Sequence, residues 1–444
     1  INNSQITLEN LIIKDNYATH NSGGINVSGG NPIIKNCIVK NNNAGWAMGG
    51  IGFHQTNAKV INTLFTNNGP CYGSAFSSWT GSNVELHHTT VVNNTGGWPI
   101  AAEDNSNISF LNSIIWSNGD KQIALGGCGS GCVDPDTLIV NYSLVENGLD
   151  SSIYFWDGGY SELIPGVGNI DVDPRFVDTD NGDYHLADWS PCIGTGLDTS
   201  IVSSTDIEGN LRPSPAGSNP DMGAYENALG APVEHIVISS DTLLVTEDSL
   251  ATVDFQDNDL VLNVTALVLS ILDSSSHGAV AVAGDTMLTY TPMADFFGFD
   301  TVQYTLNGTT AADTGFVFIT VVNEDDMPVV VNAIPDITVN EDAPDSLLAD
   351  LDVVFMDIDD ELEYSHVIVD TTLVFASVTN DSVTLQFLPD ANGSTDIIFT
   401  ATNPTIRASV SDTMTVTILP VNDAPVMSAL ADTTVDEDGA IDIF

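Results

Sequence analysis

The chain has 444 residues, of which 43% are hydrophobic, so it holds enough apolar side chains for about three domain cores. Sixty acidic residues face only eight lysines and arginines, which gives a formal net charge of −52. So few cations cannot neutralise a row of phosphates, which excludes nucleic acid and disfavours an anionic membrane surface. The natural partners of such a surface are cations, above all calcium, although surface carboxylates also serve solvation alone.

No apolar run approaches the ~18 residues that a membrane span requires, and no signal peptide is present. The chain starts at Ile1 and stops at Phe444, inside what reads as the first strand of a further module. We therefore expect a processed piece of a longer protein, secreted to the cell surface or the extracellular space. Any anchor would lie outside this piece, which we do not expect to insert into a membrane.

The five cysteines are Cys37, Cys71, Cys128, Cys132 and Cys192. Cys128 and Cys132 flank Gly-Ser-Gly, where we expect a tight disulfide in an oxidising compartment. The spacing does not supply the four Cys or His ligands of a zinc site. Because five is an odd number, at least one thiol is free or pairs outside this chain.

Segments of the first half repeat every 26 residues, and once after 24: Asn10–Asn16, Asn36–Asn42, Asn62–Asn68, His88–Asn94 and Asn112–Asn118. Apolar residues alternate within each repeat and return in the same columns, for example Leu8, Ile34, Val60, Leu86 and Phe110. Alternation predicts strands, and the constant columns predict that the strands stack in parallel. Asn recurs where the chain must turn, since it tolerates left-handed backbone conformations. The pattern predicts an all-β fold that begins with a right-handed parallel β-helix.

Five further motifs follow in order: Asp173–Phe176, Gly182–Leu186, Ser190–Gly194, Asp206–Arg212 and Pro220–Glu226. Their sequence resembles the closing turns of bacterial secreted β-helix proteins of the pectate-lyase-like superfamily. The resemblance covers residues 1 to about 226. It implies a segment that caps the C-terminal end of the solenoid, in which Arg175 and Arg212 are structural.

Related solenoids include polysaccharide lyases and glycosidases, so catalysis needs a test on residues. A lyase requires an Arg or Lys base beside its metal-binding acids, and no arginine precedes residue 170. A hydrolase requires two carboxylates across a groove, but Glu103 and Asp104 are neighbours and should point to opposite faces of a strand. We expect no enzyme activity, and a polysaccharide-active enzyme remains the alternative.

One aromatic column keeps the repeat: His20, Trp46, Tyr72 and Trp98 are spaced by 26 residues. Stacked coils would place these rings about one strand spacing, ~4.8 Å, apart. Facing outward, they would form a strip suited to stacking on the sugars of an extracellular glycan. Facing inward or wedged into a turn, they would contribute to packing. Both interpretations remain open.

After residue 227 the asparagine repeats give way to longer alternating strands rich in Val and Thr. Val321–Pro328 and Pro420–Pro425 share a Val-Asn-acid-Pro pattern, and Val-x-Glu-Asp recurs at Val245, Val339 and Val435. These patterns predict β-sandwich modules of about a hundred residues joined by acidic linkers.

The first module closely resembles the cadherin-like, Ig-like repeats of bacterial surface adhesins, through Gly278–Val282, Leu288–Pro292, Phe296–Tyr304 and Val317–Val321. We therefore expect a β-helix with its cap over 1–226, cadherin-like sandwiches over 227–323 and 324–422, and the start of a further truncated module over 423–444.

In cadherin-like proteins, acids from neighbouring modules and their linker converge on calcium, which requires six to eight oxygen ligands. The resemblance implies one joint formed by Glu247, Asp248, Asn323, Asp325, Asp326, Asp357 and Asp359. It implies a second joint with Glu341, Asp342, Asn422 and Asp423. The full vertebrate linker pattern is absent, and ordinary solvated linkers are the alternative.

These observations predict an adhesion or structural protein of the cell surface, with the sandwiches as a calcium-stiffened stalk. The solenoid would be a rod or a head that binds a glycan or a surface protein. A tethered polysaccharide lyase or hydrolase is one alternative. A fibre subunit that self-associates through strand edges is another.

Overall fold

The structure is a computed structural model that describes residues 1–69, 71–126, 135–156, 161–199, 203–284, 286–425 and 427. Cys128 and Cys132, for which we expect a disulfide, lie outside the described residues, as does most of the expected final module. Cys37, Cys71 and Cys192 are free and buried. Among the described residues, no helix is both long enough and apolar enough to cross a membrane.

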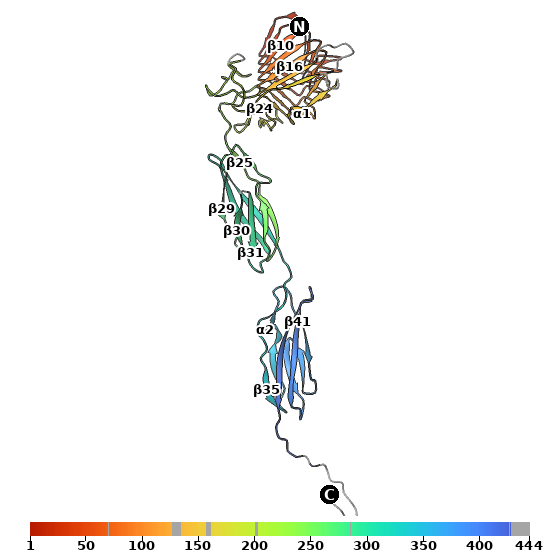
Figure 1. Ribbon diagram of the computed structural model, residues 1–444, viewed down its shortest axis with the longest axis vertical. Coiled ribbons are helices and arrows are strands. Elements are labelled where there is room, and N and C mark those ends of the chain that lie inside the picture. The colour runs from red at the N-terminus through yellow and green to blue at the C-terminus, as the bar shows by residue number, and fades with distance from the viewer. Residues whose placement is uncertain are drawn as a thin grey trace, which may run out of the picture. The chain divides into compact units, whose positions relative to one another are not determined.

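The first part of the chain is a right-handed parallel β-solenoid, in which each coil adds one short strand to each of three sheets (Figure 1). Sheet A contains β1 (Asn2–Ser4), β5 (Ile25–Gly30), β9 (Ile51–His54), β12 (Phe76–Trp79), β15 (Ile100–Ala102), β18 (Ile123–Leu125) and β21 (Ile153–Phe155). Sheet B contains β2 (Thr7–Glu9), β6 (Ile33–Lys35), β10 (Asn57–Ile61), β13 (Asn83–His87), β16 (Asn107–Leu111), β19 (Thr137–Asn141) and β22 (Glu162–Pro165). Sheet C contains β3 (Ile12–Lys14), β7 (Ile38–Lys40), β11 (Leu64–Thr66), β14 (Thr90–Val92), β17 (Ile114–Trp116) and β20 (Leu144–Val145). The pair β4 (Tyr17–Ala18) and β8 (Asn43–Ala44) and helix α1 (Gly148–Ser152) complete it.

The strand register confirms the predicted repeat, because Val60 pairs with Ile34 of the previous coil and Leu86 of the next. These three side chains are fully buried in the solenoid core. At the corner between sheets B and C, the first residue of every repeat segment adopts positive φ, for example 51° at Asn36. Asn and Asp tolerate this conformation better than most residues, and His88 takes the same role with φ of 49°.

A buried asparagine ladder forms where each coil leaves sheet C. The Nδ2 of Asn42 donates to Oδ1 of Asn68 at 3.1 Å, and Asn68 donates in the same way to Asn94 at 2.9 Å. Asn16 and Asn118 extend the ladder at its two ends. Each amide satisfies the next, so the turns bury polar groups without leaving them unpaired.

The segment that follows the last coil has β23 (Phe176–Asp178) paired with β24 (Asp183–Leu186) and is otherwise irregular. Its residues Tyr184, Met222 and Ala224 pack on the outer face of sheet C, against side chains such as Leu64 and Ile114. The expected cap thus packs against the side of the solenoid, because the outward residues of sheet C are apolar and need cover.

The expected structural role of the two arginines in this segment fits their environments. Arg212 is buried and its Nε lies 2.9 Å from the Glu226 carboxylate, while its Nη1 donates to the Gly223 carbonyl at 3.0 Å. Arg175 forms a partly exposed pair with Asp173 at 3.3 Å. Arg212 therefore anchors the segment, since a buried charge requires its partner.

Two β-sandwiches of equal topology follow. The first has a four-stranded sheet of β26 (Asp241–Thr246), β33 (Ala312–Val322), β32 (Gly298–Asn307) and β29 (Val268–Asp273), a three-stranded sheet of β27 (Ala251–Asp254), β31 (Met287–Pro292) and β30 (Gly278–Ala283), and the pair β25 (His235–Val237) and β28 (Leu260–Leu262). The second has a four-stranded sheet of β35 (Ile337–Asn340), β42 (Ser409–Leu419), β41 (Gly393–Thr402) and β38 (Glu363–Ile368), and a three-stranded sheet of β36 (Ser346–Asp350), β40 (Ser382–Phe387) and β39 (Val374–Thr379). It also contains the pair β34 (Val329–Val330) and β37 (Phe355–Met356) and the short helix α2 (Leu351–Val354).

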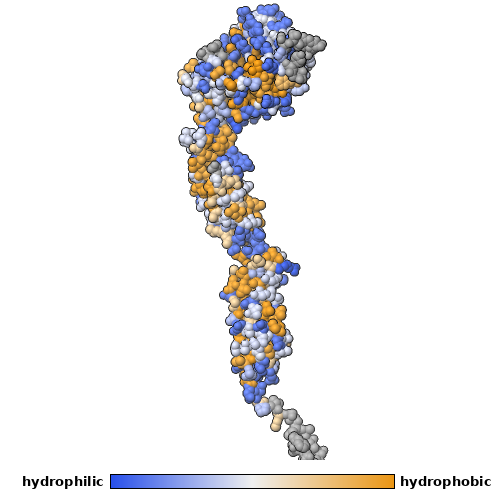
Figure 2. All heavy atoms as spheres, viewed as in Figure 1, coloured by the Kyte–Doolittle hydropathy of each residue, from blue (hydrophilic) through white to orange (hydrophobic). Residues whose placement is uncertain are grey.

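In both sandwiches the first long strand pairs in parallel with the last, β26 with β33 and β35 with β42. Alternate residues of these strands fill the cores, as Ile319 and Ile418 do. The outer faces also carry hydrophobic residues (Figure 2), among them Leu244 and Phe299, which are 70% and 82% exposed. The all-β fold predicted from the sequence is confirmed.

Candidate functional site

One group of carboxylates forms at the linker after β33. Asp248 follows β26, Asp295 follows β31, and Asp326 lies in the linker itself. One oxygen from each lies within 4.8 Å of the others. The Asp295 N–H donates to Asp248 at 3.4 Å, and Asp248 and Asp295 both have φ of 58°, a conformation that Asp tolerates.

The same arrangement occurs a second time at the linker after β42. Asp342, Asp390 and Asp423 bring three carboxylate oxygens within 4.8 Å of one another. The Asp390 N–H donates to Asp342 at 3.3 Å, and both residues again have positive φ. Each of the three positions follows its counterpart by about 95 residues, so the local geometry belongs to the repeated module.

A buried glutamate holds the linker at each of these places. The Glu247 side chain accepts the N–H of Glu324 at 2.6 Å, and Glu341 accepts the N–H of Val421 at its own linker. Glu247 and Glu341 are only 2% and 7% exposed. The Asn422 side chain donates to the Asp423 carbonyl at 3.2 Å.

A third group combines the first linker with the loop after β37. Asp325, Asp357 and Asp359 place one oxygen each within 4.8 Å of the others. The buried Asn403 amide donates to Asp325 at 2.8 Å and to Asp357 at 3.0 Å. Asn323 donates to Asp359 at 3.1 Å. Five of the seven residues expected at the first joint therefore belong to two groups that share the linker. The other two, Glu247 and Asn323, hydrogen-bond to the linker and to Asp359.

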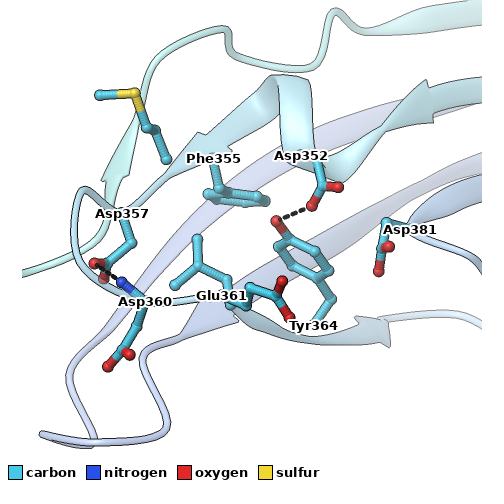
Figure 3. A pocket seen from close by; sticks show the side chains of 9 residues that line it. Asp352, Phe355, Asp357, Asp360, Glu361, Tyr364 and Asp381 are labelled. Carbon is cyan, nitrogen blue, oxygen red and sulfur yellow. Dashed lines mark hydrogen bonds between the residues drawn. The ribbon is translucent and has the colours of Figure 1, made fainter.

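The loop that carries Asp357 borders an acidic cavity of about 400 Å³ in the second sandwich (Figure 3). The Asp357 carboxylate accepts the N–H of Asp360 at 3.1 Å, which fixes the loop. On the other side of the cavity, the Tyr364 hydroxyl donates to Asp352 at 2.8 Å, and this contact together with burial raises the pKa of Tyr364. The cavity extends the negative surface beside the third group.

The carboxylates at the linkers lie close enough to repel one another. Partial burial and the carboxylates of Asp248 and Asp295 raise the pKa of Asp326. At the second linker, desolvation and the carboxylates of Asp390, Glu341 and Asp342 raise the pKa of the exposed Asp423. Among the described residues, no lysine or arginine forms an ion pair with any of these acids. The groups are therefore unneutralised by the protein itself.

The donor set fits a hard divalent cation. Calcium binds oxygen ligands at about 2.3–2.6 Å, so two ligands on opposite sides of one ion lie about 5 Å apart. Three carboxylate oxygens within 4.8 Å of one another can share such an ion. Each group supplies three of the six to eight ligands, and backbone carbonyls or water would have to supply the rest.

The expected aromatic column lies on one side of the solenoid, but its rings do not form one flat strip. The backbone stacks as predicted, since the Trp46 N–H donates to the His20 carbonyl at 2.9 Å and the Tyr72 N–H to the Trp46 carbonyl at 3.3 Å. The Tyr72 and Trp98 rings are 5.6 Å apart, whereas the Trp46 ring packs edge-on against Trp79 at 5.7 Å. The His20 ring is exposed.

A half-buried acid lies beside these rings. Glu103 follows β15, and its N–H donates to Ser78 of the previous coil at 2.9 Å. Burial, with the Asp104 and Asp136 charges adding to it, raises the pKa of Glu103 to about 7. Tyr72 lies against the same carboxyl, and burial beside Glu103 raises the pKa of its phenol.

The structure adds residues that the sequence patterns did not reveal. Asp295, Asp390 and Asn403 join the acidic groups from loops outside the linker motifs. Two prolines were the available signal, since Pro292 ends strand β31 shortly before Asp295 and Pro389 directly precedes Asp390. Tyr154 and Trp156 join the aromatic column from a later coil, where the repeat is interrupted and no alignment could place them.

Two family matches agree with this architecture. Residues 1–164 match the family described as right handed beta helix region, and residues 230–320 match the bacterial Ig domain. The chain thus contains a right-handed β-helix, a sandwich that matches the bacterial Ig domain and a second sandwich of the same topology. This combination indicates an extracellular surface protein. A search of curated proteins found no match.

A comparison with solved structures found low similarity to several proteins. An endo-fucoidan hydrolase from glycoside hydrolase family 107 is 14% identical over 48% of this chain and 31% of its own length, with a TM-score of 0.21. Extracellular cadherin domains of protocadherin gamma B7 are 15% identical over 43% and 52%, with a TM-score of 0.27. Human protocadherin-24 is 13% identical over 42% and 98%, with a TM-score of 0.30. The chain spans less than two thirds of the first two structures.

Proposed function

We propose that this chain is a non-catalytic adhesion protein of the cell surface, in which calcium stiffens the linkers of the sandwiches and the solenoid carries the ligand-binding surface. The observation that carries this proposal is the repeated carboxylate group, built by Asp248, Asp295 and Asp326 at one linker and by their counterparts at the next. Two copies of one geometry favour a common ligand over chance crowding of acids.

The physical effect of calcium would be to reverse the electrostatics of each linker. Without an ion, the carboxylates repel one another and favour open linker conformations. With an ion, Asp326 and Asp325, which are adjacent in the chain but belong to different groups, hold the linker to both neighbouring loops. A chain of such joints transmits force, as an adhesive stalk requires.

A calcium titration followed by thermal melting tests the proposal. All six tryptophans precede residue 227, so tryptophan fluorescence reports the solenoid and the segment that follows it, while calorimetry reports the whole chain. We expect millimolar calcium to raise the melting temperature of the calorimetric transition that lacks a tryptophan signal, and to leave the fluorescence transition nearly unchanged. Identical melts in calcium and in chelator would refute the calcium sites.

One observation favours a second candidate function, that of a polysaccharide hydrolase. Glu103 has a pKa of about 7 beside exposed aromatic rings, and a general acid in glycoside hydrolysis needs a raised pKa of this kind. Incubation of the chain with polysaccharides, followed by reducing-end detection, distinguishes the two functions. Release of reducing ends that is lost in Glu103→Gln would support the hydrolase.

A further inference from the structure

The outer face of sheet A differs from the other faces of the solenoid. Inward residues such as Ile51 and Phe53 fill the core, so the residues between and after them face outward. One outward column contains only small residues on successive coils, namely Gly52, Ser77, Ala101 and Ala124. These positions are nevertheless buried, and at Gly52 the Met48 side chain of the preceding turn provides part of the cover.

Four aromatic rings gather at this face, and we call them the aromatic platform: Tyr72, Trp98, Tyr154 and Trp156. Trp98 stacks on Tyr154 with ring centroids 5.1 Å apart and planes inclined by 10°, and it meets Trp156 at 4.6 Å. Tyr72 lies 5.0 Å from Trp156. Tyr154 and Trp156 are 42% and 37% exposed, so the platform combines a packed base with an open surface.

Polar groups border the platform. The Tyr72 hydroxyl, the Trp79 Nε1 and the Glu103 Oε1 are all buried, and the Glu103 carboxyl interacts with both Tyr72 and Trp79. None of these contacts has the geometry of a full hydrogen bond among the described residues. Each group therefore keeps hydrogen-bonding capacity that the hydroxyls of a ligand can use.

The register explains how the acid and the rings come together. Ala102 pairs with Leu125, and Leu125 pairs with Phe155, so Glu103, Gly126 and Trp156 follow one another on successive coils. Gly126 contributes no side chain between the Glu103 carboxyl and the Trp156 ring. This gap leaves room for the Tyr72 ring, which contacts both the Trp156 ring and the Glu103 carboxyl.

We propose that the aromatic platform and the Glu103 carboxyl form a non-catalytic binding site for an uncharged polysaccharide. A sugar ring has an apolar face of C–H groups, which stacks on aromatic rings, and a rim of hydroxyls, which can satisfy the Tyr72, Trp79 and Glu103 groups. The proposal rests on the proposed role of the solenoid as the binding part of the protein, but it does not depend on calcium.

The charge of the site selects against anionic glycans. Asp104 and Asp136 lie close enough to Glu103 to raise its pKa, so the polar edge of the platform is negative above neutral pH. The whole chain carries a formal −52. A uronate or sulfated chain would meet repulsion at the site and from the surrounding field. An uncharged glucan or mannan meets neither.

Affinity electrophoresis of the full chain tests the site. The probes are β-glucan and galactomannan, which are uncharged, and polygalacturonate and alginate, which are anionic. We expect at least one uncharged polymer to retard the wild-type chain and neither anionic polymer to do so. Trp156→Ala should weaken that retardation at least about tenfold, because it removes the exposed ring of the platform. Tyr17→Ala, which removes an exposed aromatic ring on β4, is the matched control and should change nothing.

Glu103→Gln tests the charge selection, because it keeps the shape of the side chain and removes its charge. It should increase retardation by polygalacturonate relative to retardation by the uncharged polymer. Tryptophan fluorescence melts of each variant show whether the solenoid remains folded. If Trp156→Ala unfolds, Trp156→Leu replaces it as the ring-deletion variant.

Several outcomes would overturn the proposal. These are no retardation by either uncharged polymer, stronger retardation by polygalacturonate than by glucan, equal losses in Trp156→Ala and Tyr17→Ala, or shortening of the bound polymer. Repeating the gels in calcium and in chelator separates the two proposals. If an uncharged polymer retards the chain but the melts in calcium and in chelator are identical, the calcium sites alone are refuted. If the melts depend on calcium but neither uncharged polymer retards the chain, the glycan site alone is refuted.

Discussion

Replacing Asp295 with Asn separates a calcium site from a solvated acidic linker. Asp295 supplies one of the three carboxylates of its group and has φ of 58°. Asn tolerates this conformation, so Asp295→Asn removes one negative charge and leaves the loop intact. Asp257→Asn is the matched control, because Asp257 is exposed in the same sandwich and belongs to none of the three groups.

The expected magnitude follows from binding linkage. Calcium at one hundred times its dissociation constant stabilises the folded state by about 2.7 kcal/mol per ion. Loss of one carboxylate of three should weaken binding about tenfold, which leaves about 1.4 kcal/mol at the same calcium concentration. For a domain of about a hundred residues, this difference lowers the calcium-dependent gain in melting temperature by roughly 5–10 °C.

Differential scanning calorimetry of the three chains, each in calcium and in chelator, measures this gain. In chelator, Asp295→Asn should melt at or above the temperature of the wild type, because it removes one of the charges that raise the pKa of Asp326. In calcium, it should melt below the wild type. An equal calcium gain in wild type, Asp295→Asn and Asp257→Asn would refute the reasoning.

Three further predictions concern the solenoid. Asn68→Ala should lower the free energy of unfolding by about 3 kcal/mol, because it leaves several buried partners unpaired, whereas the exposed Asn57→Ala should cost little in urea titrations. Arg212→Ala should cost about 3–5 kcal/mol and expose the segment after residue 200 to proteases, while Arg175→Ala should behave as the wild type in limited proteolysis. Glu103 has a pKa of about 7, above its usual value, so the folded solenoid binds more protons than the unfolded chain and should lose stability as the pH rises from about 4.5 to 7. Fluorescence melts across this range should lose that dependence in Glu103→Gln.

Most of the fold prediction came from the 26-residue repeat of the first half of the chain. Columns such as Ile34, Val60 and Leu86 predicted the strands, their register and the face that points to the core. This prediction was possible because the strands of each coil pair with those of the coils before and after it, and the sequence repeats once per coil. The sequence did not reveal that the segment after the last coil packs on the outer face of sheet C, since motif order does not encode which face of the solenoid is left apolar. Leu64 and Ile114 point outward from sheet C and draw Tyr184 and Met222 onto the side.

The acidic groups were partly readable from the linker motifs. Asp248, Asp326 and Asp423 stand in short signatures that recur with the module, so their convergence could be expected from a resemblance. Asp295 and Asn403 lie in loops outside those signatures, and Pro292 marks only the end of the strand before Asp295, not which carboxylates Asp295 will meet. Only the pairing of strands brings those loops to the linker.

The sequence by itself determined the classes of structure: a 26-residue repeat with asparagine corners permits only a stacked β-coil, and the period of the acidic motifs defines tandem sandwiches. Which side chains share a site was decided by the tertiary structure. Glu103 and Trp156 come from coils separated by an interrupted repeat, and Asp295 and Asp326 are separated in the chain by the two strands β32 and β33. Residues so far apart in the sequence come into contact only when backbone hydrogen bonds set the strand register. Side-chain contacts across coils and sheets depend on strand pairing and not on spacing along the chain.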